Sequence, residues 1–276
     1  MKLSLSTRVV EAPRQKEKTV MGLNDLVALA DDAGYSAVCM RASQVGIQHN
    51  ANEIAAAKQS VAVHGMAISM VTGDIDTPAN NDRAQMALQN ITPFLDLAAN
   101  LGSDLIRIGM KADTDIPWAR RAADEAAERG IRLAHQSHTC TLFETIEKSV
   151  DVLKEIDRDN FGIIFEPGNL LVCGQDYGAS ALNSFKPWLM NVYLQNMRPW
   201  ENGEQTIETW INGPVRFDLV PFGDPDGIDF APIMDALDDV GYAGYVTVHH
   251  NVADGMEIGD GVRNFASYLR SVGDFE

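Results

Sequence analysis

The feature of this 276-residue chain that most restricts its fold is a repeated alternation of short apolar runs with longer helix-like segments. Short apolar runs bounded by turn residues are typical of buried strands, and strands alternating with helices predict βα units. We predict eight strands, at residues 3–6, 37–40, 66–71, 105–108, 131–134, 162–165, 191–194 and 245–248. Helices are predicted at residues 23–33, 52–64, 82–101, 117–129 and 142–156.

Glycines mark the ends of several predicted helices. Gly34, Gly102, Gly130 and Gly241 each stand just past a helix end, where a left-handed residue is favoured. Strands separated by helices pair in parallel. Eight such units favour a closed (β/α)8 TIM barrel, with residues 1–276 as a single domain. An open doubly wound sheet is the alternative, but no GxGxxG turn supports it.

Composition restricts the partners of the protein. The formal net charge is −17, which argues against nucleic acid, because binding to phosphates depends on lysine and arginine. No run approaches the roughly 18 apolar residues of a membrane span, and the start MKLSLSTRVV lacks the apolar core of a secretory signal. Three cysteines without a CxxC pair predict a reduced protein. We therefore expect a cytoplasmic protein with a small-molecule substrate, no nucleic-acid partner and no membrane; a homo-oligomer remains open.

Polar side chains follow the last four predicted strands. The carboxyl ends of barrel strands meet at one rim, where sites of this fold are built. We therefore expect a functional cluster there. Its members are Gln136 and His138 in LAHQSHT, Glu166 and Asn169 in FEPGN, Gln195, and His249 with His250.

The chemistry of this cluster leaves two interpretations open. Glu166, His249 and Gln136 can hold a divalent metal such as Mn, Zn or Mg. The same groups without a metal suit proton transfer, with an imidazole as the base. Arg41 follows the second strand and can contact a substrate hydroxyl or phosphate. The stretch 198–229, rich in Pro, Gly and Trp, is predicted to be a long irregular loop, which in a compact domain is usually functional.

Four motifs carry a resemblance to a known family. They are KLSLST at the first strand, FEPGNLLVCGQD at the sixth, NVYLQN at the seventh, and VPFGDPDGIDFAPIMDALDDVGYAGYVTVHH before the end of the eighth. The chain resembles the xylose-isomerase-like TIM barrel superfamily, the sugar phosphate isomerase/epimerase group, over nearly its whole length. The resemblance implies a TIM barrel that acts on sugar-like molecules.

The resemblance also implies a metal site, from which this sequence departs. Relatives hold a divalent metal with Glu, Asp, His and Glu from the last four strands. These positions fall on Gln136, Glu166, Tyr193 and His249. Only Glu166 keeps a carboxylate, so the two-glutamate proton shuttle of the family cannot operate here, and a hard cation loses most of its ligand charge.

The leading functional hypothesis is an isomerase or epimerase that abstracts a proton next to the carbonyl of a sugar, keto-sugar or cyclitol derivative. Glu166, His138 and His249 are the predicted catalytic residues. The predicted substrate-binding residues are Gln136, Asn169, Gln195, Arg41 and His250. A lyase or dehydratase using the same site, and a non-catalytic sugar-binding barrel, are the alternatives.

Overall fold

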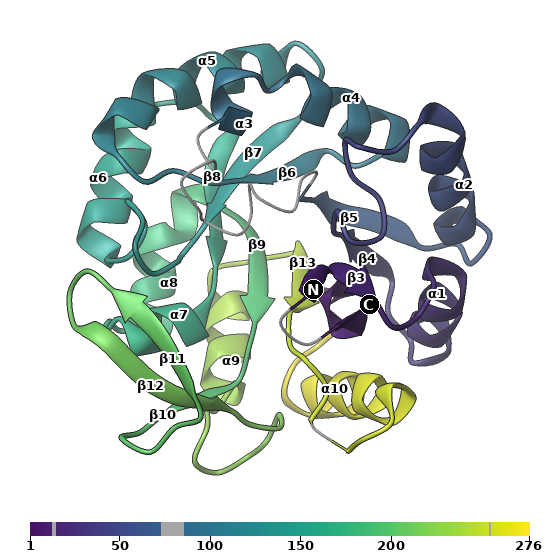
Figure 1. Cartoon of the computed structure of the whole chain (residues 1–276). Helices are drawn as coiled ribbons and strands as arrows, with labels where there is room; N and C mark the ends of the chain where they lie inside the picture. Colours follow the sequence, from purple (N-terminus) through teal and green to yellow (C-terminus); the bar gives the residue numbers. More distant parts are fainter. Residues whose placement is uncertain (13–14, 73–85, 254) are drawn as a thin grey trace.

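The computed structural model describes residues 1–12, 15–72, 86–253 and 255–276. Parallel strands close into a barrel in the order β1-β13-β9-β8-β7-β6-β5-β4, which confirms the predicted (β/α)8 fold (Figure 1). The barrel strands are β1 (Lys2–Ser6), β4 (Ala37–Met40), β5 (Ala67–Val71), β6 (Leu105–Ile108), β7 (Arg132–Gln136), β8 (Phe161–Phe165), β9 (Leu189–Leu194) and β13 (Tyr245–Val248).

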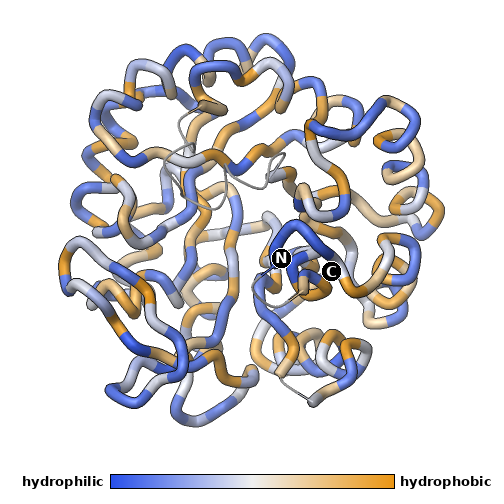
Figure 2. Tube along the Cα trace, in the orientation of Figure 1, coloured by the Kyte–Doolittle hydropathy of each residue, from blue (hydrophilic) through white to orange (hydrophobic). Residues whose placement is uncertain are grey.

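Helices surround the barrel, and their hydrophilic and hydrophobic residues alternate along the chain as expected for helices with one buried face (Figures 1 and 2). They are α1 (Leu23–Asp32), α2 (Ala51–Ala62), α3 (Met86–Gln89), α4 (Thr92–Leu101), α5 (Ile116–Ala127), α6 (Ile146–Ile156), α7 (Pro167–Val172), α8 (Ala179–Phe185), α9 (Ala231–Asp239) and α10 (Ile258–Val272). Single 3-10 turns are η1 (Thr7–Val10), η2 (Asp113–Asp115) and η3 (Lys186–Trp188). In the described part of the chain, no helix is long and apolar enough to cross a membrane.

The predicted glycine caps are confirmed. Gly34, Gly102, Gly130 and Gly241 have φ values of 84°, 79°, 67° and 73°. Glycine reaches this left-handed region without the Cβ clash that penalises other residues. Each glycine therefore ends a helix and turns the chain back toward the next strand.

Two predicted helices differ from those in the structure. The helix predicted at 142–156 begins at Ile146, because the Thr145 side chain caps it by accepting a hydrogen bond from the Lys148 N–H at 3.2 Å. The helix predicted at 82–101 is divided into α3 and α4, and a proline occupies the first turn of α4. Residues 82–85 of that prediction lie outside the described residues.

The stretch 198–229 is not the irregular loop that we expected. It contributes most of an antiparallel sheet in the order β10-β12-β11, which we call the side sheet: β10 (Met197–Pro199), β11 (Gln205–Thr209) and β12 (Gly213–Leu219). The side sheet follows β9 and lies outside the ring of barrel strands (Figure 1). Its Met197 and Phe217 pack with Val172 and Cys173 of the α7 segment in a small apolar cluster of their own.

A two-stranded ribbon follows the first barrel strand. It pairs β2 (Glu11–Ala12) with β3 (Gln15–Thr19) in antiparallel orientation. The ribbon leaves the carboxyl end of β1 through η1. Its residues therefore start at the rim where the sites of a TIM barrel are built.

Candidate active site

The barrel interior contains a layer of buried side chains below the rim. Its members are Cys39, Met70, Leu105, Ala134, Ile164 and Tyr193. Side chains two residues apart on a strand point to the same face. The position two residues after each member therefore also points inward, one level closer to the carboxyl end. This rule places Arg41, Thr72, Arg107, Gln136, Glu166 and Gln195 around the rim.

A cavity with about 840 Å³ of empty space, including its open mouth, lies at this rim. Six of the predicted site residues line it: Arg41, Gln136, His138, Asn169, Gln195 and His249. The side sheet forms part of the wall through Met197, Gln205, Thr206, Ile207, Phe217 and Leu219. The closed barrel thus brings together residues from β4, β7, β8, β9 and β13 in one cavity.

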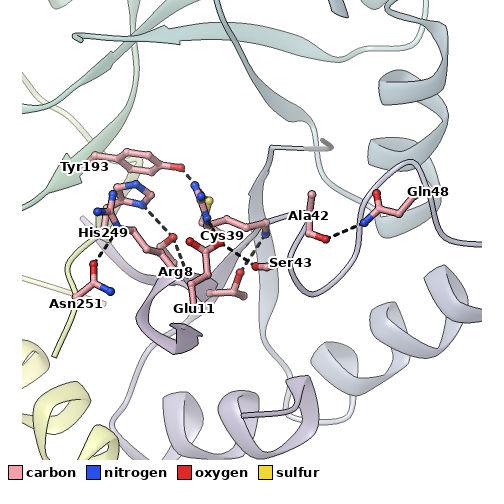
Figure 3. Close-up of polar contacts among 12 residues, drawn as sticks. Arg8, Glu11, Cys39, Ala42, Ser43, Gln48, Tyr193, His249 and Asn251 are labelled. Atoms are coloured by element: carbon pink, nitrogen blue, oxygen red, sulfur yellow. Dashed lines mark hydrogen bonds and ion pairs between the residues drawn. The ribbon is translucent and has the colours of Figure 1, made fainter. Parts of the chain in front are cut away.

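His249 follows β13 and is held in one orientation. Its ring is stacked on Tyr193 with centroids 4.1 Å apart, and its Nδ1 lies 3.0 Å from Ser6 Oγ (Figure 3). When Nδ1 donates its proton to Ser6, Nε2 carries the lone pair and can accept a proton. Burial, followed by the charges of Arg8 and Arg41, lowers the pKa of His249 well below its ordinary value. The imidazole is therefore neutral at neutral pH.

His138 lies in the loop after β7. Its Nδ1 is 3.0 Å from the Thr139 carbonyl oxygen, which can only accept, so Nδ1 carries the proton. Its backbone N–H donates to the Phe143 carbonyl at 3.1 Å. Burial and the Arg107 charge lower the pKa of His138 to about 3. The cavity therefore has a second neutral imidazole with a defined tautomer.

Three amides complete the predicted lining. Asn169 donates from Nδ2 to the Ser137 carbonyl at 2.9 Å, which ties α7 to the loop after β7. The Oε1 atom of Gln136 is buried without a hydrogen-bond partner among the described residues. A buried polar atom without a partner is costly, so this oxygen is a candidate contact for a substrate hydroxyl. Gln195 follows β9 and lines the cavity beside them.

Glu166 is placed differently from its neighbours. It follows β8 and is fully buried, and it is not among the residues that line the cavity. Burial raises the pKa of its carboxyl to about 8, although the Arg107 and Arg8 charges oppose the shift. At neutral pH the carboxyl is therefore largely protonated.

The prediction that His250 binds substrate has no support from its position. His250 is buried, lies outside the cavity lining, and packs against Phe222 and Phe265 with ring centroids 5.3 Å and 5.5 Å away. Neighbouring residues of a strand end point to opposite sides, so His249 faces the cavity while His250 faces the helices. His135 is likewise buried and stacked on Phe143 at 4.1 Å.

The sequence analysis missed three cations of the cavity. Arg8 from η1, Lys16 from β3 and Arg107 from β6 line it together with Arg41. Arg107 had a detectable signal, because an arginine stands inside the apolar strand LIRI at the inward-facing parity of Leu105. Arg8 and Lys16 had none, since a charged residue in a loop or a surface ribbon normally points into solvent.

Arg41 is neutralised within the protein. Its Nε donates to Glu11 Oε1 at 2.6 Å, and both side chains are less than 10% exposed. Ser43 donates to the same carboxylate oxygen at 2.9 Å, and Figure 3 shows Glu11 and Ser43 together. This buried pair connects the ribbon to the end of β4.

The residues at the family's metal position do not fit a divalent cation. Its four positions hold Gln136, Glu166, Tyr193 and His249, with one carboxylate, and the Tyr193 hydroxyl is 3.1 Å from Cys39 Sγ. Arginine charges surround this set, and a hard cation needs anionic oxygens. Among the described residues, no group of three or more His, Cys, Asp and Glu could hold a metal. The predicted ligand set Glu166, His249 and Gln136 is therefore not assembled as a metal site.

Curated proteins are similar to parts of this chain in sequence. The chain is 29% identical over 138 residues to an inosose dehydratase from Geobacillus thermodenitrificans, a match that covers 49% of this chain and 46% of that enzyme. A similar match at 29% identity covers 45% of this chain and 41% of an inosose dehydratase from Clostridium perfringens. The chain thus spans less than half the length of these curated relatives.

Solved structures share the fold at low sequence identity. One is described as the probable 3-DHS dehydratase of petrobactin synthesis from Bacillus anthracis, with a TM-score of 0.73, 16% identity, and coverage of 98% of this chain and 99% of that one. Another is a D-psicose 3-epimerase, with a TM-score of 0.72, 14% identity, and coverage of 99% of both chains. The model of the xylose isomerase-like TIM barrel family matches residues 27–272. Because that match spans most of the barrel, this chain belongs to the xylose isomerase-like TIM barrel family.

Proposed function

We propose that this chain is a dehydratase that acts on a small polyhydroxylated keto compound. The observation that carries the proposal is the neutral imidazole of His249, held against Tyr193 and Ser6 in a cavity whose wall also contains three arginines. A neutral imidazole has an unprotonated ring nitrogen that can accept a proton. Arginines beside it stabilise the negative charge that develops on a carbonyl oxygen when the neighbouring carbon is deprotonated.

The proposed reaction is an elimination of water. His249 Nε2 takes the proton from the carbon next to the carbonyl, and the electron pair of that C–H bond moves into the enolate. When the enolate collapses, the bond to the hydroxyl on the next carbon breaks, and the leaving oxygen takes a proton from the imidazolium. The products are water and an unsaturated ketone, and His249 returns to its neutral form.

The comparisons support elimination over isomerisation. The curated relatives with detectable sequence similarity are inosose dehydratases, and one barrel of the same fold is described as a probable dehydratase. The isomerase or epimerase that we expected first would, in the manner of the family, use two glutamates. This chain has Gln136 and His249 at those positions, so one base that also acts as the acid fits its residues better.

Epimerisation is the second candidate, because two imidazoles line the cavity. His138 follows β7 and His249 follows β13, and β8 and β9 lie between these strands in the barrel. The rings therefore approach a bound substrate from different directions. One could remove a proton from one face and the other could return a proton to the opposite face.

A substrate panel with product analysis tests the proposal. Purified enzyme is incubated with inosose, 3-dehydroshikimate, D-fructose and D-psicose, and the products are resolved by chromatography and mass. Dehydration appears as a loss of 18 mass units from the water eliminated, and epimerisation as a new stereoisomer of unchanged mass. We expect dehydration of a keto-cyclitol, with kcat at least about 100-fold lower in His249→Ala, as for loss of a general base.

The matched control is His64→Ala. His64 follows α2 at the opposite end of the barrel and bonds to Asp31 at 2.9 Å, so its removal should leave the rate unchanged. Stereoisomers without water loss would favour the epimerase. An equal rate in His249→Ala and wild type would exclude His249 as the base.

A further inference from the structure

The wall of the cavity has two chemically different sides. The ends of the barrel strands contribute polar side chains, among them Gln136, Gln195 and His249. The side sheet, which lies outside the ring of barrel strands, contributes six residues, and four of these are apolar (Figure 1). The apolar members are Met197, Ile207, Phe217 and Leu219. A molecule in this cavity therefore meets hydrogen-bonding groups from the barrel and hydrocarbon from the side sheet.

Strand pairing gives the side sheet one apolar face. Met197 pairs with Leu219, and Ile207 pairs with Val215. Residues directly opposite each other share a face of a sheet, and Phe217 joins them because it stands two residues before Leu219. The other face carries the charged residues of these strands, which are Arg198, Glu208, Arg216 and Asp218. The side sheet therefore turns its hydrocarbon face, and not its charged face, toward the cavity.

One part of this apolar face is packed onto α7. Met197 and Phe217 are 3% and 5% exposed and share an apolar cluster with Val172 and Cys173. A Cβ at Gly168 of α7 would lie only 3.3 Å from Met197 Sδ, so the glycine permits this close approach. The packing fixes the side sheet on the barrel, and the apolar wall belongs to the folded protein itself.

The other part of the face, Ile207 and Leu219, is accessible from the cavity. Both side chains line the cavity, and both are only partly buried. A ligand that covers such surface with hydrocarbon gains free energy, whereas a hydroxyl placed against it loses its hydrogen bonds to water. A substrate made only of hydroxyl-bearing carbons would therefore match the barrel side of the cavity and leave the side sheet unmatched.

We propose that the substrate carries an apolar alkyl or aryl group, attached to its polyhydroxylated keto part, that packs on Ile207 and Leu219. The inference deepens the proposed function, on which it rests for the keto part of the substrate. His249 and Gln136 receive that polar part on the barrel side, and the apolar group extends toward the side sheet. The side sheet thus determines specificity, because it favours substituted substrates over the bare polyhydroxylated ring.

Matched probes test this inference by binding. The His249→Ala enzyme is titrated calorimetrically, so that binding is read without turnover. One pair of probes is inosose and its O-benzyl ether, and the other is the methyl and the benzyl glycoside of 3-keto-D-glucose. Within each pair only the apolar group differs. We expect at least one benzyl probe to bind about tenfold or more tightly than its partner, since burial of roughly 60 Å² of apolar surface is enough for that factor.

Variants of the side sheet then locate the apolar group. In the same His249→Ala background, Ile207→Thr combined with Leu219→Thr should weaken the benzyl probe by about fivefold or more and leave its partner unchanged. Threonine suits a strand, and both positions are only partly buried, so the side sheet should keep its fold. If the double variant does not fold, Ile207→Thr alone gives the same comparison. Ile211→Thr is the matched control, because Ile211 is 51% exposed in the turn between β11 and β12, outside the cavity lining.

A preference for a benzyl probe that the double variant loses and Ile211→Thr keeps supports the inference. It is overturned if neither benzyl probe binds more tightly than its partner, or if the double variant behaves like Ile211→Thr. Sedimentation tests a second copy as the occupant of this face, and a wild-type dimer that the double variant breaks would also overturn the inference. A benzyl preference without turnover of any keto compound by the wild type would contradict the dehydratase proposal and leave this inference intact.

Discussion

Single residues of the site could be predicted from the sequence to different extents. Gln136, Gln195 and His249 were predicted correctly as rim residues, because each directly follows an apolar strand. His250, also predicted to bind substrate, lies outside the cavity lining, because it has the opposite parity at the same strand end. Arg8 could not be found at all, since its position depends on how the chain folds back after β1.

Glu166 makes a prediction about pH and stability. Its pKa rises from 4.5 to about 8 on folding through burial, so between these values the folded state holds a proton that the unfolded state releases. The stability of the wild type should therefore fall through this group as the pH rises from 4.5 to 8. The Glu166→Gln side chain has nearly the shape of a protonated glutamate, but it has no proton that titrates in this range.

The variant should gain stability relative to the wild type across that window, by an amount on the order of a few kcal/mol, and the gain should level off above pH 8. Denaturant unfolding at several pH values measures it. A constant difference between the two proteins from pH 5 to 9 would show that Glu166 titrates normally.

At the scale of elements, the side sheet is the part that the sequence predicted least well. Its strands are short and half exposed, and proline, glycine and tryptophan recur in the segment, so the period-two pattern is weak. Glu144 ties the side sheet to the loop that carries His138. Its carboxylate accepts from the Ile211 N–H at 2.8 Å and from the Cys140 N–H at 2.5 Å.

Removal of Glu144 should loosen the side sheet without unfolding the barrel. Each hydrogen bond to a charged group is worth about 1.5–3 kcal/mol, so in Glu144→Ala we expect amide hydrogens of residues 205–219 to exchange at least about tenfold faster. Amides of β6 should be unaffected. The control Glu155→Ala removes an exposed glutamate from the end of α6 and should change neither region. If amide hydrogens of the side sheet exchange at the wild-type rate in Glu144→Ala, the Glu144 hydrogen bonds do not hold the side sheet in place.

At the scale of the whole molecule, the barrel was predictable because it depends on a pattern repeated along the chain. The eight apolar runs and the helices that end at a glycine all indicate the same topology. An error in one predicted helix start therefore does not change the predicted fold. The cavity was less predictable, because its charge comes from residues far apart in sequence, such as Lys16 and Arg107.

The charge balance of the cavity also predicts how the enzyme responds to metal removal. With one largely protonated carboxylate at the family's metal position and arginines beside it, the site should not retain a divalent cation. Dialysis against EDTA, and addition of Mn²⁺ or Mg²⁺, should each change the rate by less than about twofold. Elemental analysis that finds one metal per chain, lost in Glu166→Ala and His249→Ala, would contradict this prediction.

The central claim is that His249 removes a proton next to a substrate carbonyl. The most direct test is proton NMR of two substrates, inosose and 3-dehydroshikimate, each incubated with enzyme in D₂O. The account predicts that the signal of the carbon-bound proton next to the carbonyl disappears or moves to product with wild-type enzyme. In His249→Ala this loss should be at least about 100-fold slower. Equal proton loss in both enzymes, or none with either substrate, would contradict it.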